Sequence, residues 1–203
     1  MKIEKIINFL NLRRKKCQYG DNLHINGIVF IHGRKNGVKI GNNCTIQSSE
    51  SINPTSGFAH THLRAEQDGM ICIGNNVGIS HANITAFSGV TIEDNVLIGS
   101  GAKIWDTDFH PVNYQNRVEN SEPLSRPIRI KEGAFVGACS IILKGVTIGE
   151  HSVIGAGSVV TKDVPDNEVW ARNPAKLMRK IGGGVSSNLL IRWSVAERSL
   201  CYA

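Results

Sequence analysis

The chain has 203 residues, 21 of them glycine, and a formal net charge of +6. This length allows one domain with a substantial core. The basic residues gather near the two ends without interleaved aromatic side chains, which argues against a nucleic-acid partner. Five cysteines at irregular spacing, with no CxxC pair, argue against a disulfide framework and favour a reducing, cytoplasmic location.

Residues 1–22 are predicted to form a short helical cap. Ile3, Ile6, Ile7 and Leu10 recur at helical spacing, so they are expected on one face of the helix. We expect this face to pack on the domain. Peripheral association with a membrane surface is the second interpretation, while stable membrane insertion is not expected because the apolar run is too short and polar.

Aliphatic residues recur at every sixth position through most of residues 23–165. A small residue follows most of them four positions later, and Gly, Asn, Asp and Glu fill the positions between. This pattern predicts a short strand and a corner in each repeat, stacked in parallel around a three-sided coil with aliphatic ladders inside. The in-step runs are Ile40–Ile46–Ile52, Ile92–Ile98–Ile104 and Ile130–Val136–Ile142–Ile148–Ile154–Val160.

The segment IKEGAFVGACSIILKGVTIGEHSVIGAGSVVTKDV at 130–164 resembles the hexapeptide-repeat acyltransferases. The resemblance implies an all-β fold, a left-handed parallel β-helix with short N- and C-terminal helices and one projecting loop. It also implies acetyl-CoA as co-substrate, direct transfer without a covalent acyl-enzyme, no metal, and a homotrimer with sites between subunits.

The repeat breaks at residues 110–127, a polar segment bounded by prolines that is predicted to project as a loop. The next in-step position after Ile104 is His110, and histidine can take the proton from an attacking hydroxyl. The string DTDFHPV is similar to the segment with the catalytic histidine in galactoside and maltose O-acetyltransferases, which implies that His110 is the general base. Asp106 and Asp108 either orient His110 or hydrogen-bond backbone amides at a corner; both interpretations stay open.

A second irregularity lies at residues 79–91, where the spacing of aliphatic residues is one longer than two repeats require. Counting places Asn83 in an inward slot normally held by a small residue. The resemblance implies an acceptor-binding asparagine on this coil, and it points to His81 and Asn83. It also places Phe135 where relatives have a tryptophan beside the acceptor pocket.

The preceding stretch contains His60 and His62, an HxH pair outside the repeat. Such a pair can contribute to a metal site, but no third ligand is evident. The stretch is therefore interpreted as a polar loop.

The last coils and the segment 166–203 are assigned to coenzyme A by the same resemblance. Small side chains would let the backbone approach the pantetheine arm, and basic side chains suit the phosphates. The implied residues are Ala138, Ala156, Thr161, Lys162, Lys176 and Arg179. A solvated basic helix is the alternative interpretation of the last two. Trp170 and Arg172 stand where relatives have small residues, and they either add a contact or fill the groove; a further short helix is expected around residues 189–195.

Together these features predict an acetyl-CoA-dependent O-acetyltransferase for a hydroxyl of a sugar or polysaccharide precursor. Another small acceptor, such as an amino sugar, a drug or serine, is one alternative. A non-catalytic or zinc-dependent β-helix is another, although zinc would require three converging histidines that the sequence does not show.

Overall fold

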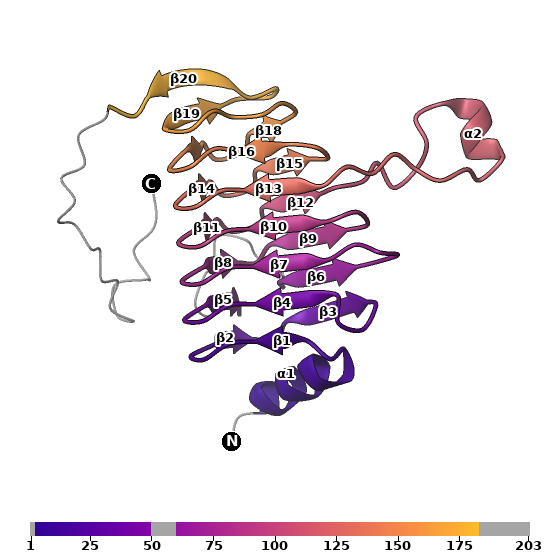
Figure 1. Ribbon diagram of the computed structural model, residues 1–203, viewed down its shortest axis with the longest axis vertical. Helices are drawn as coiled ribbons and strands as arrows, with labels where there is room; N and C mark the ends of the chain where they lie inside the picture. The colour runs from indigo at the N-terminus through magenta and orange to yellow at the C-terminus, as the bar shows by residue number, and fades with distance from the viewer. Residues whose placement is uncertain (1–2, 50–59, 183–203) are drawn as a thin grey trace.

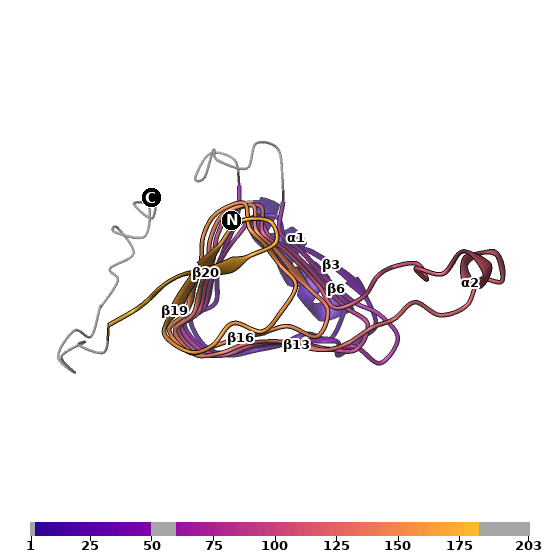
Figure 2. The ribbon, with the colours of Figure 1, turned by 90° about the horizontal axis from the view of Figure 1, so that it is seen from above.

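The computed structural model describes residues 3–49 and 60–182, which form a rod of stacked coils (Figure 1). Seen from the C-terminal end, the coils outline a triangle, and the chain turns clockwise from β13 and β16 through β19 to the side with β3 and β6 as it rises (Figure 2). A clockwise turn toward the viewer is left-handed. The predicted left-handed parallel β-helix is confirmed.

Three sheets form the sides of the rod; the coils from β1 to β18 contribute one strand to each sheet, and β19 and β20 extend one of the three. Sheet A contains β1 (Gln18–Tyr19), β4 (Val38–Ile40), β7 (Ile71–Ile73), β10 (Val90–Ile92), β13 (Ile128–Ile130) and β16 (Thr147–Ile148). Sheet B contains β2 (His24–Gly27), β5 (Thr45–Ser48), β8 (Gly78–Ser80), β11 (Leu97–Ile98), β14 (Phe135–Val136), β17 (Val153–Ile154), β19 (Glu168–Ala171) and β20 (Lys176–Lys180). Sheet C contains β3 (Phe30–Gly33), β6 (His62–Ala65), β9 (Asn83–Ala86), β12 (Lys103–Trp105), β15 (Ile141–Leu143) and β18 (Val159–Val160).

The core consists of aliphatic ladders, one behind each sheet. Strand register places residues of successive coils directly over one another, and removal of these side chains from water is the main stabilising contribution. The sheet C ladder is Ile31, Leu63, Ile84, Ile104, Ile142 and Val160, all buried. In the second coil, Leu63 occupies the position of the sheet C ladder. Ile52, predicted to continue the run Ile40–Ile46, lies outside the described residues.

Asparagines mark the corner between sheets A and B. Asn22, Asn43, Asn76 and Asn95 all have left-handed backbone conformations, with φ between 56° and 61°. Their side-chain amides bond from coil to coil, at 3.0 Å from Asn22 to Asn43, 3.3 Å from Asn43 to Asn76 and 3.1 Å from Asn76 to Asn95. Asparagine tolerates this conformation and supplies a donor and an acceptor, which explains the repeated asparagine at this corner.

The prediction that Asn83 points inward is wrong. Ala82 is fully buried in that slot, and Asn83 faces outward from β9. Only five positions separate Ile79 from Ile84, and eight separate Ile84 from Ile92, so one corner is short and the next is long. The two changes nearly cancel in the sequence, which is why simple counting misplaced this residue.

Helix α1 (Ile3–Arg14) closes the N-terminal end of the rod (Figure 1). Its packing face differs from the predicted one, because Ile3, Ile6 and Leu10 are exposed. The buried contact uses Asn8, whose Nδ2 donates to Gly27 O at 2.8 Å and whose Oδ1 accepts from Val29 N at 3.0 Å. The edge of the first coil presents unpaired backbone groups, so a polar side chain suits this position better than an aliphatic one.

At the other end, β20 pairs antiparallel with β19 and extends sheet B. The interpretation of Lys176 and Arg179 as part of a basic helix is wrong, since both lie in this strand. The helix expected around residues 189–195 lies outside the described residues.

The predicted polar loop around His62 is also wrong, because residues 62–65 form β6. His62 Nδ1 lies 3.3 Å from His32 Nε2, with nearly parallel ring planes. The ring of Phe30 stacks on His62 with centroids 5.0 Å apart. An N–H···N bond between two imidazoles needs one neutral acceptor nitrogen, so full protonation of both rings disrupts the pair.

Burial is the main cause that lowers the pKa of both His32 and His62 below the ordinary 6.5, and nearby positive charge adds to it. The folded chain then binds fewer protons than the unfolded chain, so stability falls as pH drops below about 6.5. We expect Tm, followed by circular dichroism, to fall more steeply from about pH 7 to about pH 5 in the wild type than in His62→Asn. His24→Asn, at an exposed position, serves as control and should follow the wild type. Parallel curves for wild type and His62→Asn would refute this role of the pair.

Candidate active site

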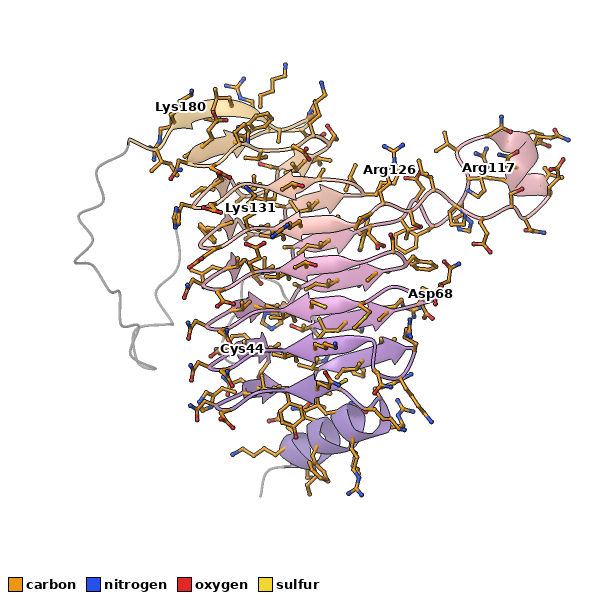
Figure 3. All side chains as sticks on the ribbon, in the orientation of Figure 1. Cys44, Asp68, Arg117, Arg126, Lys131 and Lys180 are labelled. Carbon is orange, nitrogen blue, oxygen red and sulfur yellow. The ribbon has the colours of Figure 1, made fainter. Side chains whose placement is uncertain are left out.

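An arm leaves the rod between β12 and β13 and carries α2 (Tyr114–Val118) (Figure 1). Thr107 and Ser125 pair across its base as an antiparallel bridge, and their hydroxyl oxygens lie 2.9 Å apart. Asn113 caps α2 by accepting hydrogen bonds from two backbone amides of its first turn. Figure 3 shows Arg126 at the base of the arm and Arg117 at its far end. The predicted projecting loop is confirmed, and it begins closer to Asp106 than to residue 110.

Asp106 is fully buried at the base of the arm. Its carboxylate accepts hydrogen bonds from the backbone amides of Phe87, Ser88 and Gly89 at 2.8, 2.7 and 2.6 Å. These bonds compensate for the burial of a charge that would otherwise be costly. Of the two interpretations from sequence, the structure shows backbone hydrogen bonding for this residue, and it holds the corner of the coil below the arm.

Asp108 makes an ion pair that neither interpretation included. Its Oδ1 lies 2.5 Å from Lys144 Nζ, and both side chains are about one-quarter exposed. Lys144 follows β15 in the next coil, so the pair ties the arm to the rod. Sequence reasoning missed Lys144 because 36 positions separate the partners and the intervening arm has no fixed repeat.

His110 lies exposed at the base of the arm, next to Phe109. Phe109 has a left-handed backbone conformation, with φ at 60°. Its ring stands nearly perpendicular to that of Trp105, with centroids 5.5 Å apart. A residue with a Cβ seldom adopts this φ, and such strain concentrates at functional sites.

The outer face of sheet C beside the arm carries Trp105 and Asn83. The indole Nε1 of Trp105 donates to Asn83 Oδ1 at 3.0 Å, and Thr85 Oγ1 donates to the same oxygen at 3.3 Å. The amide oxygen of Asn83 is therefore fixed, while its amide N–H groups can donate to a ligand. His81, by contrast, is buried in the corner before β9, with φ at 42°. Asn83 and not His81 is the residue on the accessible face.

The residues expected to bind coenzyme A lie along the upper coils. Corners of three successive coils between sheets B and C stack through backbone bonds, with Cys139 N donating to Ser100 O and Gly157 N to Ala138 O, both at 2.8 Å. A column of small residues results. It contains Ala138 and the exposed Ala156. Thr161 and Lys162 are exposed after β18, and Lys176 and Arg179 are exposed on β20.

Trp170 packs against the core at the last coil, and its Nε1 donates to Glu168 Oε2 at 2.8 Å. Arg172 is exposed with φ at 91°. Trp170 thus closes the coil, whereas Arg172 remains accessible beside the column.

The predicted site residues do not all meet within one chain. His110, Asp108 and Asn83 belong to the arm and to sheet C. Phe135 lies in β14 of sheet B, which occupies the side of the triangle away from the arm (Figure 2).

Within residues 3–49 and 60–182, no three His, Cys, Asp or Glu side chains are grouped so that they could hold a metal ion. Over the same residues, no helix is both long and apolar enough to cross a membrane.

The family profile described as bacterial transferase hexapeptide (six repeats) matches residues 127–162, and hexapeptide repeat of succinyl-transferase matches residues 89–104. Galactoside O-acetyltransferase of Escherichia coli is 48% identical over 92 residues, which are 45% of this chain and 44% of that protein. A putative acetyltransferase of Saccharomyces cerevisiae is 41% identical over 113 residues, 55% of this chain and 56% of that protein. The chain thus spans about half the length of the curated relatives it matches.

Among solved structures, a galactoside acetyltransferase in complex with coenzyme A aligns with a TM-score of 0.59 at 28% identity, covering 90% of this chain and 74% of that chain. An N-acyltransferase from Bacillus cereus, in complex with coenzyme A and dTDP-4-amino-4,6-dideoxyglucose, aligns at 0.66 with 20% identity over 90% of each chain, a likeness of fold. The resemblance to hexapeptide-repeat acetyltransferases is confirmed.

Asp106→Asn should destabilise the fold, because an amide nitrogen replaces one acceptor oxygen and leaves a buried backbone N–H unpaired. The expected loss in the free energy of unfolding is about 1–3 kcal/mol for each unpaired group. Urea denaturation measures it, with Asp68→Asn as control, since that carboxylate is fully exposed. Equal stability of the two variants would contradict the role assigned to Asp106.

Proposed function

We propose that the protein transfers an acetyl group from acetyl-CoA to a hydroxyl of a sugar or polysaccharide precursor. The observation that carries this proposal is the exposed His110 next to Phe109, whose ring contacts Trp105, in a chain that is similar to acetyltransferases. The solved neighbours that hold coenzyme A or acetyl-CoA support the choice of donor. A cytoplasmic location fits this donor.

In this mechanism the neutral imidazole of His110 accepts the proton of the acceptor hydroxyl as its oxygen attacks the thioester carbonyl. The tetrahedral intermediate then collapses, the C–S bond breaks, and the coenzyme A thiolate takes the proton from the imidazolium. Acetyl passes directly to the acceptor. The ion pair of Asp108 with Lys144 and the contact between the rings of Phe109 and Trp105 hold the segment that contains His110.

The surroundings of His110 favour a sugar acceptor. Sugars present C–H faces that pack on aromatic rings and hydroxyls that need donors and acceptors. Phe109 is partly exposed and perpendicular to Trp105, and Asn83 adds amide N–H groups on the same face. An acceptor with few hydroxyls would leave the polar part of this surface unpaired.

The donor would lie along the column of small corner residues. Ala138 and Ala156 permit close approach of pantetheine, and Thr161 and Lys162, exposed at the far end of β18, would contact the nucleotide. The other two basic residues expected to bind coenzyme A, Lys176 and Arg179 on β20, would face its phosphates.

A homotrimer would complete the site. His110 and Phe135 lie on opposite sides of one chain, so a shared pocket requires two copies. The arm also exposes apolar side chains by half or more, namely Val112, Tyr114, Val118 and Leu124. Exposed apolar residues on a projecting arm favour contact with another copy, and a repeated head-to-tail contact closes into a ring.

His110→Ala should lower kcat by about 10²–10⁴-fold, the usual contribution of a general base. Thiol release from acetyl-CoA across a panel of sugars measures turnover, and calorimetry should show unchanged coenzyme A binding. Wild-type turnover in the variant would refute the assignment of His110.

Trp105→Ala and Asn83→Ala should raise KM for the sugar and leave KM for acetyl-CoA unchanged. A decrease of about 5- to 50-fold in kcat/KM corresponds to one lost stacking or hydrogen-bond contact. Thr91→Ala, an exposed position on sheet A, is the control. An effect confined to acetyl-CoA would place the donor, not the sugar, on this face.

A further inference from the structure

Helix α1 carries an apolar stripe on the side that faces away from the rod. Ile3, Ile6, Phe9 and Leu10 are 74%, 40%, 52% and 56% exposed. Residues three, four and seven apart lie on one side of a helix, so Ile3, Ile6 and Leu10 form a line, and Phe9 lies at its edge. Aliphatic side chains inside the coil are almost completely buried. The stripe therefore contrasts with the aliphatic interior of the coils.

The fold itself does not need this stripe. The opposite side of α1 attaches the helix through polar groups: besides Asn8, Asn11 Nδ2 donates to Val29 O at 3.3 Å and Lys15 Nζ to Gly33 O at 2.5 Å. Leu12 is the buried aliphatic residue on that side. These bonds attach α1 without the outer residues, so the apolar character of the outer residues points to a partner outside residues 3–49 and 60–182.

The charges around the stripe indicate what that partner is. Lys5, Arg13, Arg14 and Lys16 are exposed along and just after α1, and Glu4 is the acidic residue among residues 3–16. If a second copy of α1 were the partner, the basic residues of the two helices would face and repel each other. Anionic lipid headgroups complement them, while long basic side chains let the apolar stripe enter the boundary of the acyl chains.

The place of α1 in the molecule suits such a surface. Figure 1 shows the helix lying across the end of the rod, with its outer side directed away from the coils. The arm leaves from the fourth coil, which strand spacing places about 15–20 Å further along the rod. In a cyclic trimer, rotation keeps every α1 at the same level, so three helices would meet one plane together.

We propose that α1 is an interfacial anchor that binds the surface of a bilayer containing anionic lipid. Ile3, Ile6, Phe9 and Leu10 enter the headgroup region, and the basic residues contact the headgroups. The helix lies on the membrane and does not cross it.

Co-sedimentation with vesicles tests this proposal on the full chain. The wild type should bind vesicles of phosphatidylcholine with about 30% phosphatidylglycerol. Its binding to vesicles of phosphatidylcholine alone should be at least about 10-fold weaker. Ile6→Asp combined with Leu10→Asp should lower binding at least about 10-fold, because two charges enter the apolar stripe. Arg13→Ala combined with Arg14→Ala should weaken binding to the anionic vesicles alone, and added salt should have the same effect.

Tyr19→Asp is the matched control, since Tyr19 is 48% exposed on β1 close to α1 but outside the stripe. It should bind like the wild type. Because Ile6 and Leu10 are exposed, the double variant should keep its Tm and its acetyl transfer to a soluble acceptor, which separates this test from that of the proposed function. Undiminished vesicle binding by the double variant would overturn the proposal. So would lipid-free higher oligomers, seen by sedimentation velocity, that disappear in the same variant.

Discussion

Every coil of this molecule depends on the hydrogen bonds that its strands make with the coils above and below. The peptide groups of short strands find their partners one coil away and not within the same turn. Each coil must therefore follow the triangle of its neighbours, and any additional residue has to leave at a corner. That constraint produces the arm, because residues 106–127 cannot be accommodated in the triangle and extend outward from one corner. The proposed general base lies where this constraint is released.

The same requirement explains why the architecture could be predicted from the sequence. Ile92, Ile98 and Ile104 keep a period of six because each must occupy the inner side of one sheet. Asparagine recurs at the corner between sheets A and B because the residue at this position has a left-handed backbone conformation. His110 is a candidate from the sequence because it interrupts this period and stands in the string DTDFHPV, and its role stays a prediction.

Other contacts could not be derived from the period. The bond from Trp105 to Asn83 and the ion pair of Asp108 with Lys144 join positions 22 and 36 residues apart, and their geometry depends on corners whose lengths vary. The wrong orientation of Asn83 has the same origin, since one short and one long corner almost cancel. The packing face of α1 was wrong for a different reason. Hydrophobic periodicity identifies a helical face but not whether its counterpart is aliphatic core or unpaired backbone.

The sites in this protein thus combine rigid and irregular parts. Stacked coils hold the column with Ala138 and Ala156 in place, and the arm supplies His110 from a strained segment next to Phe109. In the proposed trimer, division of the site between sheet B and the arm would make one chain present two complementary halves. Specificity for the acceptor would then change through the arm and the outer face of sheet C while the core remains the same.

The two ends of the rod have one more consequence. A stack of coils that stops abruptly offers its open edge as a template, and identical molecules could join end to end into a fibre. Here Asn8 occupies one backbone donor and one acceptor at the first edge, and β20 reverses the strand direction at the last. The first edge of one molecule therefore cannot pair with the last edge of another. Growth by addition of molecules is blocked at both termini of the coil, and the protein keeps a defined length.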